Sequence, residues 1–241
     1  MNTIILAAGE GRRLHPLTLE RPKAMLNVGG RTLIERALDG LQNAGISMTD
    51  IIILSGHKSA LLEAAAPECT FIHNKIYDST NNIYSLWLAR ERLAGEEFIL
   101  LNSDVLFSKK MAVDVLSDDR ESVLVVDDVS PLVTEEMRVK VDGKGRITEI
   151  AKTLDVEESA GEYIGLARFG RDFSKALFER IGEMVSTDQT DVWYENAIND
   201  ILDTFPLYSL STRGMPWIEI DDHGDLDRAS EIAKKIDDLE G

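Results

Sequence analysis

The loop that follows the first apolar run combines flexible backbone with positive charge. It reads L-A-A-G-E-G-R-R from Leu6 to Arg13, and Lys23 follows it closely. Glycine lets backbone amides approach phosphate oxygens, and Arg13 and Lys23 supply the fixed charge that a triphosphate needs. A dinucleotide fingerprint would place Gly or Ala where this chain has Leu14, and a P-loop would continue with Gly-Lys-Ser/Thr. The loop therefore predicts another kind of triphosphate site; the alternative is a structural turn beside surface arginines.

Three carboxylates at two distant places are suited to hold a divalent cation. Asp104 follows an apolar run, where a buried carboxylate needs a partner. Glu219 and Asp221 are two residues apart, so in a strand both project from one face and repel each other unless a cation lies between them. We predict that Asp104, Glu219 and Asp221 hold Mg²⁺ beside the triphosphate. The alternative is a solvated edge strand with spare acids, and we assign Asp222 to the approach of the next helix.

Apolar runs and helix-like segments alternate in the first half of the chain. Strands are expected at residues 4–8, 51–54, 71–74 and 98–101, and helices at 33–44, 57–66 and 82–93. This alternation predicts an α/β fold with a mainly parallel sheet covered by helices on both faces. Ligands of such sheets gather at the carboxyl ends of the strands, where the glycine loop and Asp104 both lie.

The second half changes character. Strands are expected at 122–127, 138–141, 146–150, 163–169 and 217–221, with a hairpin turn at 142–145, and helices at 173–184, 191–205 and 225–239. No linker composition divides the chain. We predict a single domain over residues 1–241, in which residues 1–110 form the half that binds the triphosphate and residues 111–241 the half that binds its reaction partner.

Composition excludes several classes of protein. The formal net charge of −17 argues against a nucleic-acid partner, because the phosphate backbone would be repelled. The single cysteine, Cys69, excludes an internal disulfide and favours a reducing, cytoplasmic compartment. The first apolar run is short and lacks a basic segment before it, so we expect a buried strand and no membrane insertion.

The segment from Leu6 to Met25 resembles a family signature. Its pattern L-A-A-G-x-G-x-R-L-x-P-L-T, followed by P-K-x-M, is similar to that of the sugar-phosphate nucleotidylyltransferase superfamily. The resemblance implies a three-layer α/β/α Rossmann-like nucleotidyltransferase fold with a mostly parallel mixed sheet. It also implies that Arg13 and Lys23 are catalytic residues that grip the phosphates, and that Asp104 and an acid of the Glu219–Asp221 pair lie at metal positions.

A second segment resembles one branch of that family. Residues 74–86 are similar to the N-x-x-Y-x-x-T-N-N-x-x-S-L segment of phosphocholine-type cytidylyltransferases, which implies CTP as the nucleotide. The residues themselves do not identify the base, and Thr80 or Asn81 also has the chemistry of a helix cap. The predicted nucleotide-binding residues are Leu6, Ala7, Ala8, Gly9, Glu10, Gly11, Arg12, Ser55, Gly56, Asn81, Ser85, Asn102 and Ser103.

The resemblance places the acceptor in the second half of the chain. Lys152 lies where the family has a lysine that meets the acceptor phosphate, and Gly161–Gly165 resembles the cytidylyltransferase branch. A choline head would favour aromatic faces, for which the candidates are Tyr84, Tyr163, Trp193, Tyr194 and Trp217. Asp191 and Glu195 flank this set and would instead suit a primary ammonium. Core packing is the alternative for Trp193 and Tyr194.

The implied reaction is an attack by an acceptor phosphate or phosphonate oxygen on the α-phosphorus of CTP. Pyrophosphate leaves, and phosphocholine, 2-aminoethylphosphonate and related small acceptors stay open. The alternatives are a sugar-1-phosphate or polyol-phosphate nucleotidylyltransferase and a nucleotide-sensing regulatory subunit on the same fold. The presence of Arg13, Lys23 and all three acids favours an enzyme. Homodimers are common in the family, so the resemblance also admits a homodimer.

Overall fold

Four apolar runs from the first half of the chain form the parallel part of a central sheet. They are β1 (Asn2–Ala7), β4 (Ile51–Ser55), β5 (Thr70–His73) and β6 (Phe98–Asn102), in the spatial order β6-β1-β4-β5. The central strands are buried on both faces, as parallel strands covered by helices must be. The computed structural model describes residues 1–133 and 136–240.

Strands from the second half extend this sheet, mainly by antiparallel pairing. The long strand β11 (Gly161–Phe169) pairs with β6 and also with β8 (Val123–Asp127) and β9 (Arg138–Val141). The strand β10 (Ile147–Ala151) pairs with β9, and β12 (Tyr208–Ser211) runs parallel to β8. The sheet is therefore mixed, with its parallel pairs concentrated in the first half of the chain.

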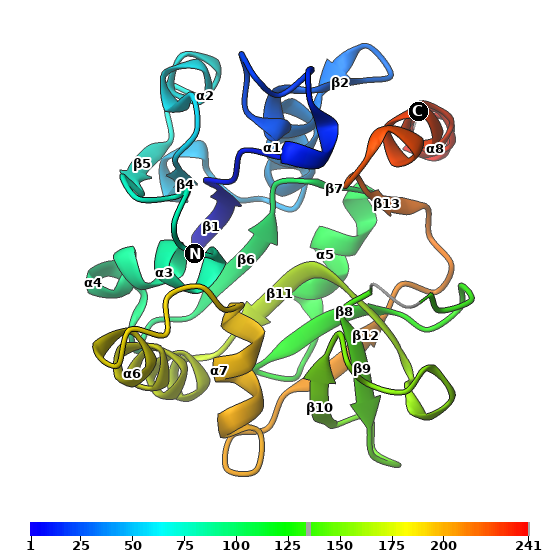
Figure 1. The fold of residues 1–241 in the computed structure, drawn as a ribbon. Helices are drawn as coiled ribbons and strands as arrows, with labels where there is room; N and C mark the ends of the chain where they lie inside the picture. Colours follow the sequence, from blue (N-terminus) through cyan, green and yellow to red (C-terminus); the bar gives the residue numbers. More distant parts are fainter. Residues whose placement is uncertain (134–135, 241) are drawn as a thin grey trace.

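Helices cover both faces of the sheet, as Figure 1 shows. Two separate hydrophobic clusters lie between the sheet and the two helix layers. One layer contains α1 (Leu33–Asn43), α2 (Ser59–Ala65) and α5 (Lys109–Ser117), and the other contains α3 (Asn82–Leu88), α4 (Arg90–Leu93), α6 (Arg171–Ser186) and α7 (Tyr194–Ile201). The predicted three-layer α/β/α fold with a mixed sheet is thus confirmed.

A third, smaller unit packs against one end of these layers. The strands β7 (Val105–Phe107) and β13 (Trp217–Glu219) form an antiparallel pair, and α8 (His223–Glu240) packs beside it. Figure 1 shows α8, which carries the C-terminus, beside the N-terminal segment that contains β2. Three residues are fully buried together in this unit: Leu14 from the N-terminal segment, Ile220 directly after β13, and Ala233 from α8. The smallest elements are β2 (Asn27–Val28), β3 (Arg31–Thr32) and the 3-10 turns at Arg12–Leu14, Lys23–Met25, Met48–Asp50 and Val156–Glu158.

Two predicted helices were too long. The helix expected at 82–93 is interrupted at Ala89, which separates α3 from α4. The helix expected at 191–205 begins only at Tyr194, because tertiary hydrogen bonds hold the preceding residues: Asn81 N–H donates to the Thr190 carbonyl, and Tyr194 N–H donates to Asn82 Oδ1. The sequence pattern also missed β2, β3, β7, α5 and β12; four of these are strands too short to show a clear period.

The strand expected at 217–221 ends at Glu219. Asp221 and Asp222 turn away from it because their backbone N–H groups donate to Oδ2 of Asp225, while Asp222 Oδ1 accepts from the Asp225 N–H. These reciprocal bonds cap α8, which confirms the helix-approach role of Asp222.

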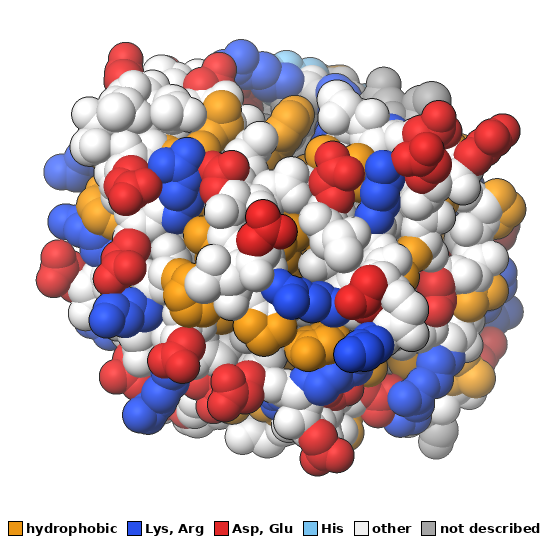
Figure 2. All heavy atoms as spheres, turned by 90° about the horizontal axis from the view of Figure 1, so that it is seen from below, with side chains coloured by type: hydrophobic (Ala, Val, Ile, Leu, Met, Phe, Trp, Pro, Cys, Tyr) orange, Lys and Arg blue, Asp and Glu red, His pale blue; other side chains and the backbone are white. Residues whose placement is uncertain are grey.

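The surface carries mixed charge. Figure 2 shows acidic and basic side chains interspersed over the face that it draws. Within the described residues, every helix is too short or too polar to cross a membrane.

The Asp225 cap yields a stability prediction. Asp225→Ala removes the acceptor of two backbone N–H groups, so we expect the free energy of unfolding to fall by about 0.5–2 kcal/mol. Urea denaturation monitored by circular dichroism measures it. Asp227→Ala, the same change at an exposed position of α8, is the matched control. Equal unfolding midpoints for both variants would contradict the capping role.

Candidate active site

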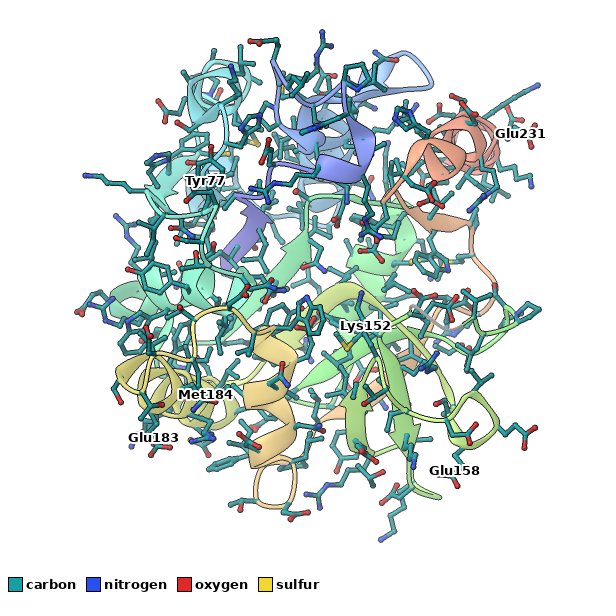
Figure 3. The ribbon with its side chains drawn as sticks, in the orientation of Figure 1. Tyr77, Lys152, Glu158, Glu183, Met184 and Glu231 are labelled. Atoms are coloured by element: carbon teal, nitrogen blue, oxygen red, sulfur yellow. The ribbon has the colours of Figure 1, made fainter. Side chains whose placement is uncertain are left out.

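A cavity of about 300 Å³ lies at the carboxyl ends of β1 and β6. Its walls come from both halves of the chain. Figure 3 shows Tyr77, from the segment after β5, and Lys152, from the turn after β10, on opposite sides of this region. The predicted site residues that line it are Leu6, Ala7, Ala8, Gly9, Gly11, Arg13, Lys23, Asn81, Ser85, Asn102, Ser103, Asp104, Lys152, Tyr163, Trp193, Glu219 and Asp221.

The pairing of β7 with β13 brings the three predicted metal acids together. Val105 lies opposite Glu219, so Asp104, which precedes β7, comes beside the residues that follow β13. The Ile220 N–H donates to the Asp104 carbonyl at 3.0 Å and fixes this register. As a result, one carboxylate oxygen each from Asp104, Glu219 and Asp221 lies within 4.8 Å of the others.

Lys23 lies between two of these acids. Its Nζ is 2.8 Å from Asp104 Oδ2 and 2.7 Å from Asp221 Oδ1, and its side chain is only 13% exposed. Arg13 contacts the other oxygen of Asp221 at 2.8 Å. The two cations predicted to grip the phosphates therefore neutralise two of the acids in this state.

The electrostatics of the acids differ according to their neighbours. Burial and the charges of Asp104 and Asp221 raise the pKa of Glu219 to about 8. Burial also opposes the ionised form of Asp221, but Lys23 and Arg13 outweigh it and lower the pKa of Asp221. Burial would lower the pKa of Lys23, yet the two carboxylates overcome it and raise that pKa. Glu219 is thus the acid of this cluster that most lacks a compensating cation.

The glycine loop presents backbone to the cavity. Open space surrounds the position that a side chain would take at Gly9, so the backbone there is accessible to a ligand. Gly11 adopts φ +68°, a left-handed conformation that favours glycine, and its carbonyl accepts a bond from Thr18 Oγ1. The loop is thus held by this hydrogen bond, while its backbone at Gly9 stays open to a ligand.

Two predicted nucleotide-binding residues lie in an adjoining space. Glu10 and Arg12 line a neighbouring cavity of about 330 Å³ together with Arg13, Lys23 and Asp221. Arg12 Nε is 2.8 Å from Glu10 Oε2. Because Arg13, Lys23 and Asp221 border both spaces, the two cavities adjoin each other at these side chains.

The segment between β5 and α3 is ordered by its own amide groups. Asn74 Nδ2 donates to Thr80 Oγ1 and to Ser85 Oγ, and Asn81 Oδ1 accepts from the Asn82 N–H at the start of α3. Asn81 therefore does cap the helix, and it also lines the cavity. The capping role and the predicted nucleotide-binding role of Asn81 are therefore compatible.

The other end of the cavity contains Lys152, Trp193 and Glu195. The Lys152 Nζ lies 5.3 Å from the centre of the Trp193 ring, within range of a cation–π contact. Buried Arg138 donates to the Lys152 carbonyl and so positions the turn. Burial raises the pKa of Glu195 to about 7, against hydrogen bonding and the charge of Lys152, which lower it.

Six predicted site residues line neither of these two cavities. Ser55 is fully buried, and Gly56 packs against the Ala8 carbonyl and Tyr77. Both lie beneath the glycine loop, since the residue after Gly56 donates its backbone N–H to Ala8. Tyr84 of α3 is absent from the lining of both cavities, although Asn81 and Ser85 beside it line the first one.

The remaining three are predicted acceptor-binding residues. Tyr194 is completely buried and its hydroxyl bonds that of Tyr163 at 2.9 Å, so it packs behind the wall. Asp191 is exposed in the loop before α7. Trp217 lies two residues before Glu219, and its Nε1 donates to Asp127 Oδ2 at 2.7 Å, which holds the ring beside a separate cavity. Core packing, the alternative for Tyr194, is confirmed.

The site prediction missed several lining residues, the most informative of which are Tyr77, Asn82 and Gly165. Tyr77 and Asn82 belong to the 74–86 segment, so that resemblance was the available signal. Gly165 adopts φ +85° at an irregularity in β11, where a Cβ would clash with Asn102. The sequence signal for Gly165 was a glycine in the interior of a predicted strand, which often marks a close approach of the backbone.

The three acids fit a divalent cation such as Mg²⁺. Their oxygens are close enough to share one ion, and Oδ1 of Asp104 is buried without a hydrogen-bond partner among residues 1–133 and 136–240. Mg²⁺ binds through a small number of carboxylates together with phosphates, which this donor set allows.

A family model and several known proteins resemble the chain. The model described as the MobA-like NTP transferase domain matches residues 3–134. The chain is 27% identical to the choline-phosphate cytidylyltransferase of Streptococcus pneumoniae over 238 residues, which cover 97% of this chain and 99% of that protein. It is 28% identical to the bifunctional IPC transferase and DIPP synthase of Aquifex aeolicus over 96% of its own length, but spans about half (51%) of that protein.

A solved structure has the same fold. The CTP:phosphocholine cytidylyltransferase from Streptococcus pneumoniae superimposes with a TM-score of 0.80 and 28% identity, covering 96% of this chain and 98% of the other.

The contacts of Lys23 yield a prediction on metal affinity. In Lys23→Met no ammonium competes for Asp104 and Asp221, so we expect the nucleotide-free protein to bind Mn²⁺ about three- to tenfold more tightly. Isothermal titration calorimetry measures the affinity. Lys110→Met, which removes an exposed ion pair on α5, is the control. An affinity that stays the same or weakens in Lys23→Met would show that Lys23 does not compete at this position.

The raised pKa of Glu195 predicts a pH-dependent stability. Between the ordinary value of 4.5 and about 7, folding favours the protonated form, so Glu195 contributes stability that is lost as pH rises through this window. Relative to wild type, Glu195→Gln should become more stable as pH rises, by up to about 1.4 kcal/mol per unit. Urea denaturation at pH 5, 6 and 7 measures the trend, with Glu179→Gln on the exposed side of α6 as control. A pH-independent difference would refute the assignment.

Proposed function

Because the chain belongs to the family of MobA-like NTP transferase domains, we propose that it is a CTP-dependent cytidylyltransferase. It is a nucleotidyltransferase, and its relatives include cytidylyltransferases. The proposed reaction transfers CMP to a small phosphorylated or phosphonate amino-alcohol of the phosphocholine or 2-aminoethylphosphonate type, with release of pyrophosphate.

One observation carries this proposal: Lys23 contacts Asp104 and Asp221 inside a cavity that the glycine loop and Lys152 also line. Phosphate-binding backbone, a cation, metal-binding acids and an acceptor-side lysine are the parts that nucleotidyl transfer requires. They come from distant segments and meet in one space.

The nucleotide is proposed to occupy the end formed by the glycine loop and α3. The amides near Gly9 and Gly11 and the guanidinium of Arg13 would bind the β- and γ-phosphates. The base would lie near Ala8, Asn81 and Ser85, whose amide and hydroxyl groups can bond a pyrimidine. The assignment of CTP rests on the cytidylyltransferase relatives.

Asp104, Glu219 and Asp221 would hold Mg²⁺, which when bound neutralises charge on the α-phosphate and the leaving pyrophosphate. Lys23, which lies between Asp104 and Asp221, is the cationic side chain next to these acids. Lys23 is therefore assigned the stabilisation of negative charge that develops at the reacting phosphorus.

The acceptor would enter from the Lys152 side. One of its phosphate or phosphonate oxygens attacks the α-phosphorus, and the bond from that phosphorus to the bridging oxygen breaks. Pyrophosphate departs with the electron pair. The attacking oxygen is already anionic, so no general base is needed, and alignment by Lys152 and charge stabilisation by Lys23 and Arg13 supply the catalysis.

The test is a pyrophosphate-release assay of four NTPs against phosphorylated amines, polyols and sugars. We expect turnover with CTP and an amino-alcohol phosphate or phosphonate. Lys23→Ala should lower kcat by about 100-fold or more, because a cation at the reacting phosphate is lost. Lys175→Ala, an exposed change on α6, should retain wild-type activity.

Signal from UTP or dTTP with glucose 1-phosphate alone, or from CTP with polyol phosphates alone, would replace the proposal by the corresponding nucleotidylyltransferase. Near-normal pyrophosphate release by Lys23→Ala would remove its catalytic assignment. Binding of CTP without turnover of any acceptor would favour a sensing role.

A further inference from the structure

The acceptor end of the cavity has more acidic than basic groups. Arg13 and Lys23 are engaged by Asp221 and Asp104 at the other end. Among the described lining residues, Lys152 is therefore the basic residue at the acceptor end. Its charge acts on both Glu195 and Glu219. An acceptor phosphate that binds Lys152 would withdraw this cation from the two carboxyl groups.

Glu195 is fixed in place at this end. It is only 4% exposed yet borders the cavity from the first turn of α7. The preceding residue, Tyr194, is wholly buried; its N–H donates to Asn82 Oδ1 and its hydroxyl bonds Tyr163. The backbone that carries Glu195 is therefore held from two sides, and the carboxyl group has little freedom to turn away to solvent.

The carboxyl group of Glu195 is incompletely satisfied. In the part of the chain that the structure describes, its Oε2 is buried without a hydrogen-bond partner. Buried polar groups in proteins almost always have partners, and an unpaired one is costly. A carboxyl group of this kind beside a cavity indicates that a ligand supplies the missing positive charge or donor.

The same end does not form an aromatic cage. Of the described aromatic residues that line the cavity, Tyr77 lies on the nucleotide side and Tyr163 is 4% exposed with its hydroxyl bonded to Tyr194. Trp193 offers one face, and Lys152 lies over it. A quaternary ammonium is bound mainly by several aromatic faces, which this arrangement lacks.

We infer that the acceptor carries a primary ammonium group and that Glu195 is the residue that binds it. The inference rests on the proposed function and narrows its acceptor class. Lys152 binds the phosphate or phosphonate of the acceptor, Glu195 binds the ammonium, and Trp193 packs against the short carbon chain between them.

A primary ammonium matches Glu195 better than the other head groups do. It brings both a positive charge and three N–H donors, so it can form charge-assisted hydrogen bonds with the carboxylate. A trimethylammonium brings charge without any donor. A polyol brings donors without the charge that two neighbouring carboxyl groups require.

The test is a matched series of acceptors with CTP: 2-aminoethyl phosphate, its N-trimethyl form phosphocholine, and propyl phosphate, which has no amine. For the wild-type protein, we expect kcat/KM to be at least about tenfold higher for 2-aminoethyl phosphate than for the other two. Glu195→Gln should lower kcat/KM for 2-aminoethyl phosphate by about 100-fold and change that for propyl phosphate less than about threefold. The matched control Glu179→Gln should change neither.

A wild-type preference for phosphocholine or propyl phosphate would overturn the inference and leave the proposed function intact. An equal loss for all three acceptors in Glu195→Gln would assign Glu195 a structural role and overturn its assignment to the ammonium. The wild-type series decides the acceptor class even if the variant does not fold. Absence of pyrophosphate release from CTP with every phosphate or phosphonate acceptor would overturn both the function and the inference.

Discussion

Three carboxylates cannot share a small, half-buried volume without positive charge, and the rest of the site depends on this constraint. Asp104 and Asp221 are held together by Lys23, with Arg13 on the outer oxygen of Asp221. Ion pairs of this kind gain strength where solvent is excluded. The protein thus keeps these acids close in the absence of a ligand, and the cations that compensate them are those proposed to meet the phosphates.

The charge balance differs between the two ends of the cavity. At the nucleotide end, two cations and open backbone amides face a space suited to a polyanion. At the acceptor end, Lys152 faces Glu195 and Glu219, and burial raises the pKa of both carboxyl groups. A protein with a net charge of −17 therefore concentrates basic groups locally where phosphate is proposed to bind.

Features set by residues close together in the sequence were predicted more accurately than features set by contacts between distant residues. The strands of the parallel half were located within one or two residues, because continuous apolar runs report burial directly. Helix α7 was predicted three residues too early, because hydrogen bonds to Asn81 and Asn82 decide where it begins. Trp217 and Tyr194 were plausible cavity residues by type, yet Asp127 and Tyr163 hold them elsewhere.

The sequence by itself determined the chemistry of the nucleotide end: the glycine loop, Arg13, Lys23 and the three acids, together with the α/β class of the fold. These features depend on residue type and on local periodicity, both of which can be read from the amino-acid sequence alone. Only the tertiary structure decided that Asp104 meets Glu219 and Asp221, because the register of β7 against β13 joins segments that are far apart in the chain. It also decided which of the acceptor-side carboxylates borders the cavity: Glu195 does, and Asp191 is left in solvent, since burial depends on how α7 packs.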